Sequence, residues 1–148
     1  MLTVLNNLNI KSVDIENNCL NAKYKENVHV MMDSELFGKE HKCKTSVIVR
    51  ALYGLRSNEN AWRSEFSTFI TNELRCVSSM ADPEFYIKTF KKPDDSKYYY
   101  YSYLIIYVDD ILCIHHNQTV TVDIIQGTYR SKQSIEDPKM YIGTDMRK

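Results

Sequence analysis

The sequence has no excess of either charge and few of the residues that mark special classes of protein. It contains 19 basic and 19 acidic residues, so its formal net charge is zero. Proteins that bind nucleic acid by themselves usually carry a basic excess, so such a role here needs a local patch or further parts of a longer protein. With 4 glycines, 3 prolines and a hydrophobic fraction of 43% in 148 residues, the composition excludes collagen-like, low-complexity and disordered classes.

Long hydrophobic runs and paired cysteines are also absent. No apolar run reaches the roughly 18 residues of a membrane span, because the longest, Tyr98 to Ile114, is interrupted by Ser102, Asp109 and Asp110. We expect no secretion signal, since the start has neither a basic region nor a small-residue cleavage site. The 4 cysteines form no CxxC pair, so we expect reduced thiols.

Apolar periodicity predicts a mixture of helices and strands. The clearest helix covers about 58–74, where one apolar stripe is formed by Trp62, Phe66, Phe69, Ile70 and Leu74. Strands are predicted at 8–15, 28–32, 45–52, 84–90, 98–108, 111–115 and 140–146. We also expect a short helix within 16–27, a loop over 33–44, a turn in 91–97 and a helix over about 119–132. This order predicts an α+β fold with antiparallel hairpins in one domain, 1–148.

Two adjacent carboxylates, Asp109 and Asp110, lie at the tip of the predicted 98–115 hairpin. One interpretation is a solvated turn. The other is a divalent-metal site, because Mg²⁺ takes oxygen ligands and adjacent carboxylates repel unless a cation lies between them. Asp14 ends the first predicted strand and is either a turn residue or a further ligand. If the two strands are neighbours, the three carboxylates could hold two metal ions.

Several segments, taken in order, resemble the reverse transcriptase of copia-type retrotransposons. The resemblance covers nearly the whole chain from about residue 8. The segments are Val13-Asp14-Ile15-Glu16-Asn17 with Leu20-Asn21, then Val49-Arg50-Ala51-Leu52-Tyr53-Gly54-Leu55-Arg56, Ala61-Trp62, Ala81-Asp82-Pro83, Tyr107-Val108-Asp109-Asp110 and Tyr141-Ile142-Gly143.

The resemblance implies a polymerase-palm-like antiparallel sheet with packed helices, incomplete fingers and no thumb. Asp14, Asp109 and Asp110 would be the catalytic carboxylates and would bind two Mg²⁺ ions for RNA-directed DNA polymerisation. The implied partners are an RNA or DNA template-primer and dNTPs, the fingers, thumb and ribonuclease H regions of a polyprotein, and no membrane. The implied location is cytoplasmic, in a virus-like particle. The residues implied to contact nucleotide or template are Cys19, Gly54, Arg56 and Tyr107.

The sequence also departs from the family pattern. Asn17 is followed by Asn18 and Cys19, where the family has Ala and then an aromatic ring that excludes a ribose 2′-hydroxyl. The absence of recognisable fingers and thumb predicts weak activity or none for the chain alone. Two other interpretations stay open. The chain is either a non-catalytic relic or repurposed binding module with a palm fold, or an unrelated α+β protein whose Asp-Asp turn is incidental.

Overall fold

A computed structural model describes residues 7–91, 97–117, 119–132 and 134–146. The described residues form two compact units. The first unit is built from the residues up to Asn18 and from Phe66 onward, and the second is built from Cys19 to Glu65. The long helix α4 (Asn58–Asn72) contributes its first half to the second unit and its second half to the first. None of the helices in the described parts of the chain has the length and apolar character needed to cross a bilayer.

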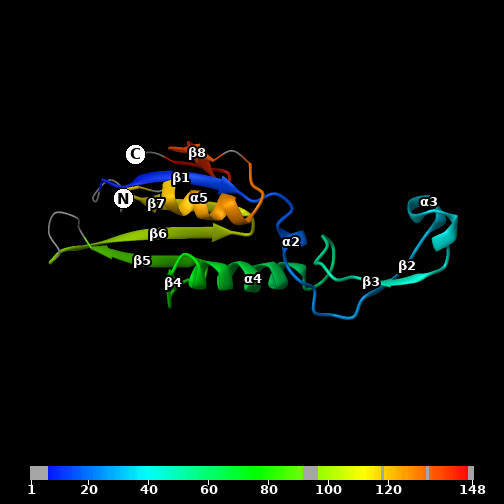
Figure 1. Cartoon of the computed structure of the whole chain (residues 1–148). Coiled ribbons are helices and arrows are strands. Elements are labelled where there is room, and N and C mark those ends of the chain that lie inside the picture. The colour runs from blue at the N-terminus through cyan, green and yellow to red at the C-terminus, as the bar shows by residue number, and fades with distance from the viewer. Residues whose placement is uncertain (1–6, 92–96, 118, 133, 147–148) are drawn as a thin grey trace. The chain divides into compact units, whose positions relative to one another are not determined.

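The first unit is organised around a six-stranded antiparallel sheet, whose strands run side by side in the order β4-β5-β6-β7-β1-β8 (Figure 1). The sheet confirms the predicted α+β class with antiparallel pairing. The strands, in chain order, are β1 (Asn9–Asp14), β4 (Val77–Ser78), β5 (Phe85–Lys91), β6 (Tyr99–Tyr107), β7 (Asp110–His115) and β8 (Ile135–Glu136).

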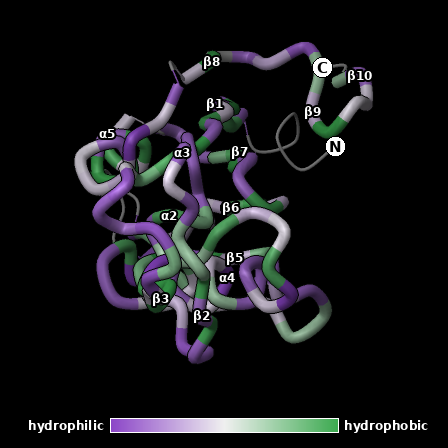
Figure 2. Tube along the Cα trace, turned by 90° about the vertical axis from the view of Figure 1, so that its right-hand side faces the viewer, coloured by the Kyte–Doolittle hydropathy of each residue, from purple (hydrophilic) through white to green (hydrophobic). Residues whose placement is uncertain are grey.

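Both faces of the central strands carry aromatic or aliphatic side chains, which explains their largely uncharged sequence; the trace beside the β6 label in Figure 2 is accordingly white to green. Alternate side chains of a strand point to opposite faces. On one face, Leu8, Ile10, Leu112 and Ile114 form a buried cluster, against which Tyr141 and other partly buried residues pack. The opposite face presents another buried set, Val13, Tyr86, Leu104, Ile106, Ile111 and Cys113.

Two helices cover this opposite face, the second half of α4 and α5 (Thr119–Thr128). The predicted stripe of α4 is confirmed, because Trp62, Phe66, Phe69, Ile70 and Leu74 are all buried. Phe66 and Phe69 pack edge-on against the Tyr129 ring just after α5, with ring centroids 5.5 and 5.0 Å away. Such aromatic contacts join the two helices into one layer.

The second unit contains short elements only. A two-stranded antiparallel sheet pairs β2 (His29–Met31) with β3 (Thr45–Val47). The chain enters the unit through α2 (Asn18–Asn21), the short helix predicted within 16–27. Between β2 and β3 lie α3 (Ser34–Phe37) and a 3₁₀ turn at Lys39–His41. The guanidinium of Arg50 donates a hydrogen bond to the Asn21 carbonyl oxygen, 2.9 Å away.

Several predicted elements were wrong in detail. The helix expected over about 119–132 ends at Thr128. The loop expected over 33–44 contains α3, because Asp33 caps that helix by accepting a hydrogen bond from the Glu35 N–H at 2.8 Å. The strand expected over 140–146 is instead a hairpin of β9 (Met140–Tyr141) and β10 (Thr144–Asp145). Ile142 and Gly143 both have positive φ, which suits a tight two-residue turn. The strand expected over 45–52 ends at Val47, and residues 92–96 of the expected 91–97 turn lie outside the described residues.

Candidate active site

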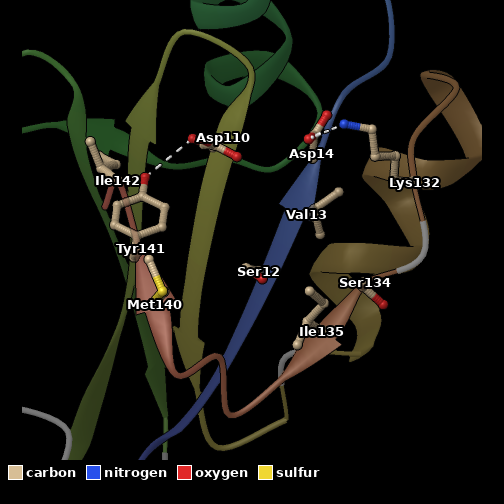
Figure 3. A pocket seen from close by; sticks show the side chains of 10 residues that line it. All are labelled: Ser12, Val13, Asp14, Asp110, Lys132, Ser134, Ile135, Met140, Tyr141 and Ile142. Carbon is tan, nitrogen blue, oxygen red and sulfur yellow. Dashed lines mark hydrogen bonds and ion pairs between the residues drawn. The ribbon is translucent and has the colours of Figure 1, made fainter. Parts of the chain in front are cut away.

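The register between β1 and β7 places Asp14 directly opposite Asp110. Directly opposed residues of an antiparallel pair point to the same face of the sheet, with Cβ atoms about 4.5–5.5 Å apart. Figure 3 shows the two carboxylates at the ends of their strands, on the side of a shared pocket. The strands predicted to carry the carboxylates are therefore neighbours, as the metal-site interpretation of the sequence required.

Asp109 lies in the turn between β6 and β7, whereas Asp110 is already the first residue of β7. Two residues, Val108 and Asp109, connect the paired residues Tyr107 and Asp110. The Asp109 carbonyl oxygen accepts a hydrogen bond of 3.0 Å from the Ile15 N–H, which fixes the turn against the end of β1. The three predicted carboxylates thus belong to two adjacent strand ends and the turn between β6 and β7.

The turn itself is strained at Val108, whose φ is 56°. A two-residue hairpin turn with positive φ at its first central residue ordinarily takes glycine there. A β-branched side chain is a genuine outlier in this region, because its Cβ crowds the backbone. Strained backbone of this kind costs roughly 1–3 kcal/mol and is concentrated at functional sites.

The electrostatics of the site are dominated by negative charge. The pKa of Asp110 is raised above its ordinary value, first by burial and then by the negative charges of Asp109 and Asp14. The positive charge of Lys132 opposes this rise in the pKa of Asp110. The neighbouring carboxylates therefore add to the effect of burial on Asp110, and the ammonium of Lys132 offsets only part of the rise in pKa.

Lys132 was not predicted from the sequence as a site residue. Its Nζ lies 2.6 Å from Asp14 Oδ2, and its backbone N–H donates to the Asp14 carbonyl oxygen at 3.0 Å. The hydrogen bond to Asp14 raises the pKa of Lys132, and the charge of Asp14 adds to this effect. The two residues are 118 positions apart, so no local pattern in the sequence could have paired them.

A cavity of about 800 Å³ opens beside the two carboxylates (Figure 3). Tyr141 forms part of its wall, and the hydroxyl donates to the carbonyl oxygens of Asp110 and Ile105, at 3.2 and 3.3 Å. Burial raises the pKa of Tyr141. This phenol therefore stays protonated and positions the start of β7. Ten residues line the cavity: Ser12, Val13, Asp14, Asp110, Lys132, Ser134, Ile135, Met140, Tyr141 and Ile142.

The donor chemistry of the site suits a hard divalent cation. Mg²⁺ prefers carboxylate oxygens and is commonly bound through one or two carboxylates together with substrate phosphates. Asp14 and Asp110 supply two carboxylates on one face, and added positive charge would relieve the repulsion that acts on Asp110. Within the residues that the structure describes, no three His, Cys, Asp or Glu side chains are gathered closely enough to hold a metal ion by themselves.

The other predicted site residues are placed differently. Tyr107 is exposed and pairs with Asp110 in the β6–β7 ladder. Cys19, Gly54 and Arg56 belong to the second unit, so their contact with a nucleotide or template stays a prediction. Cys19 is 1% exposed and accepts a hydrogen bond from the Asn58 amide, with Nδ2 and Sγ 3.4 Å apart. Gly54 has a φ of 87° and open space where a Cβ would project, so the turn conformation accounts for the glycine.

Comparison with known proteins gives a distant relationship. The chain is similar to the retrovirus-related Pol polyprotein from transposon RE2 of Arabidopsis thaliana, with 24% identity over 143 residues. The match covers 94% of this chain and only 9% of that polyprotein. No family model matches the chain, and no solved structure matches it. The similarity supports a retrotransposon-related origin for nearly the whole of the chain.

Proposed function

We propose that this chain is the palm region of a copia-type reverse transcriptase and that its ancestral activity is RNA-directed DNA polymerisation. The observation that carries this proposal is the β1–β7 register, which brings Asp14 opposite Asp110 beside the turn that holds Asp109. The similarity to a retrotransposon Pol polyprotein over 94% of the chain supports the retrotransposon-related origin on which this proposal builds. The strained Val108 turn adds a third, independent argument for a functional site.

Each carboxylate has a role in this proposal. Asp14 and Asp110 present their oxygens on one face, and Asp109 adds a further carboxylate from the turn. Asp14, Asp109 and Asp110 would hold two Mg²⁺ ions, which would supply activation of an attacking primer hydroxyl and stabilisation of a leaving phosphate oxygen. Positioning and electrostatic stabilisation would then provide most of the rate. Gly54, Arg56 and Tyr107 remain the candidates for contact with nucleotide or template.

A specific contact favours a second candidate, a palm-fold relic or repurposed binding module without catalysis. The ammonium of Lys132 already neutralises Asp14, with 2.6 Å between Nζ and Oδ2. A metal ion that binds Asp14 must share or displace this ammonium, which weakens metal binding. The zero net charge also gives little long-range attraction for a phosphate backbone. We therefore expect weak Mg²⁺ binding and no measurable primer extension by the chain alone.

The deciding experiment is primer extension on an RNA template with dNTPs and Mg²⁺. Wild type is compared with Asp109→Asn and Asp110→Asn, and with Asp123→Asn as a control for loss of an exposed carboxylate on α5. Extension that both site variants abolish and the control preserves would establish a working polymerase and refute the relic. Absence of extension together with Mg²⁺ binding that depends on Asp110 would support the relic.

The assignment of Cys19 has its own test. A thiol is much smaller than the aromatic ring that the family has at this position, so any extension by this chain should also accept ribonucleotides. Wild type and Cys19→Tyr are compared with dNTPs and with rNTPs. Ribonucleotide use by wild type that Cys19→Tyr suppresses would support the assignment. Strict rejection of ribonucleotides by an extending wild-type chain would refute it.

A further inference from the structure

Two cationic side chains lie opposite each other in the second unit. Lys23 and Arg50 form an antiparallel bridge between two segments of the chain. The two backbone hydrogen bonds of this bridge, each 3.1 Å long, join the residues on either side of the pair and not Lys23 and Arg50 themselves. In a pair of this kind the opposed side chains lie closest together. The ammonium and the guanidinium therefore extend from the same face of the ribbon.

This pairing is unfavourable as it stands. Like charges directly opposite each other destabilise an antiparallel pair. Both side chains are exposed, and within the described residues neither of them forms an ion pair with a carboxylate. The guanidinium of Arg50 donates to the Asn21 carbonyl oxygen at 2.9 Å, which holds it in place and leaves its charge uncompensated. An anion bound between the two cations would replace their repulsion by attraction.

A cavity of about 370 Å³ opens beside the pair, and both cations line it. Sites for small molecules have volumes of about 300–1,000 Å³, so this cavity has room for a small ligand. Asn27 also lines it, with an amide that can donate to an oxyanion. The aliphatic residues of segment 47–49 line another side, which suits an uncharged substituent on the anion.

Glu26 is the acidic residue among the described residues that line this cavity, and its carboxylate is already engaged. One oxygen, Oε2, accepts a hydrogen bond of 3.1 Å from the Tyr24 hydroxyl, and the other accepts one from the Ser57 hydroxyl. Tyr24 follows Lys23 directly in the chain and so points to the opposite face of the ribbon. The carboxylate is thus held by two hydroxyls and compensates neither cation.

We propose that Lys23 and Arg50 bind the dianionic phosphate group of a phosphomonoester. Two adjacent positive charges match a group that carries a charge of about −1.5 to −2 at pH 7 and offers three strong acceptor oxygens. The bond from Arg50 to Asn21 uses one of the five guanidinium donors and leaves others for phosphate oxygens. A phosphodiester carries a single charge and matches the pair less well. None of these residues belongs to the carboxylate site, so the inference is independent of the polymerase proposal.

The test is a calorimetric titration of the full chain, at constant ionic strength, with methyl phosphate as the monoester and dimethyl phosphate as the diester. Methyl phosphate should bind saturably and at least several-fold more tightly than dimethyl phosphate. Lys23→Met should weaken the binding of methyl phosphate about tenfold, because it removes one of the two charged contacts. Lys42→Met removes an exposed lysine of the same unit that does not line the cavity, and it should leave the affinity unchanged.

A second variant separates loss of binding from loss of folding. Lys23→Glu places opposite charges in the bridge, so it should raise the Tm of the chain without ligand. Methyl phosphate should raise the Tm of wild type, because it binds the folded state, and should have no effect on the Tm of Lys23→Glu. A variant that melts above wild type and no longer binds the ligand is folded, so its loss of binding reports on the site.

A DNA oligonucleotide with and without a 5′-phosphate shows whether a nucleic-acid end or a small molecule supplies the group. Tighter binding of the phosphorylated strand than of methyl phosphate would assign the site to a strand end, and weaker binding would assign it to a small phosphomonoester; both support the proposal. Three results would overturn it: no saturable binding of methyl phosphate, equal affinity for dimethyl phosphate, or equal losses in Lys23→Met and Lys42→Met. Primer extension is judged separately, through Asp109 and Asp110.

Discussion

Replacing Asp110 with Asn should stabilise the folded chain at neutral pH. Asp110 faces Asp14 directly across two adjacent strands, and like charges in such a pair destabilise a sheet by roughly 0.2–1 kcal/mol. Asparagine keeps the size of the side chain and removes the charge. The hydrogen bond from Tyr141 is retained, because it ends on the Asp110 backbone carbonyl. For a chain of this size the gain corresponds to a rise of about 1–3 °C in Tm.

The pKa of Asp110 determines how the stability gain of Asp110→Asn changes with pH. Burial and the neighbouring carboxylates raise the pKa of Asp110 above its ordinary value of 3.8. Between the unfolded and the folded pKa, the native state binds more protons than the unfolded state. The free energy of unfolding therefore falls as pH rises through this window. The advantage of Asp110→Asn should be complete at pH 7 and disappear below about pH 3.

The assay is thermal unfolding followed by circular dichroism at pH 3 and pH 7, with and without Mg²⁺. The metal should raise the Tm of wild type, because binding at a metal concentration of ten times Kd adds about 1.4 kcal/mol to the free energy of unfolding. The effect on Asp110→Asn should be smaller, because this variant lacks one of the carboxylates that would bind the metal. Asp123→Asn on α5 is the matched control and should behave as wild type. If Asp110→Asn is less stable than wild type at pH 7, burial and the neighbouring carboxylates do not disfavour the charged form of Asp110 as argued.

Further predictions concern strain, packing and surface. Val108→Gly should raise the free energy of unfolding in urea by about 1 kcal/mol, because glycine accepts a positive φ; an unchanged value would argue against strain in the turn. Ile125→Ala should lower the free energy of unfolding by about 2–4 kcal/mol, since Ile125 is fully buried. In a thiol-labelling assay at pH 8, exposed Cys43 should react first, because burial raises the pKa of Cys76 to about 11 and of Cys113 to about 12. The chain alone should self-associate or bind a hydrophobic dye, because large apolar side chains such as Leu36 and Met80 are exposed; a monodisperse monomer with a sharp melt would contradict this.

Local patterns were enough to predict the type of most elements. The stripe from Trp62 to Leu74 predicted α4, and the apolar run that ends at the Asp109–Asp110 pair predicted the β6–β7 hairpin. Periodicity succeeds in these segments because each residue's burial follows from the geometry of its own helix or strand. It failed over 33–44, where one side-chain cap at Asp33 starts a helix without any apolar stripe.

The sequence by itself determined which carboxylates could form a site, and the tertiary structure decided how they meet. Strand register depends on the packing of whole faces, and it placed Asp110 rather than Asp109 opposite Asp14. The ammonium of Lys132 reaches Asp14 only because the chain returns to the end of β1 after 118 residues. The pairing of Lys23 with Arg50 was equally invisible, since which residues of two distant segments lie opposite each other depends on a register that only the fold sets.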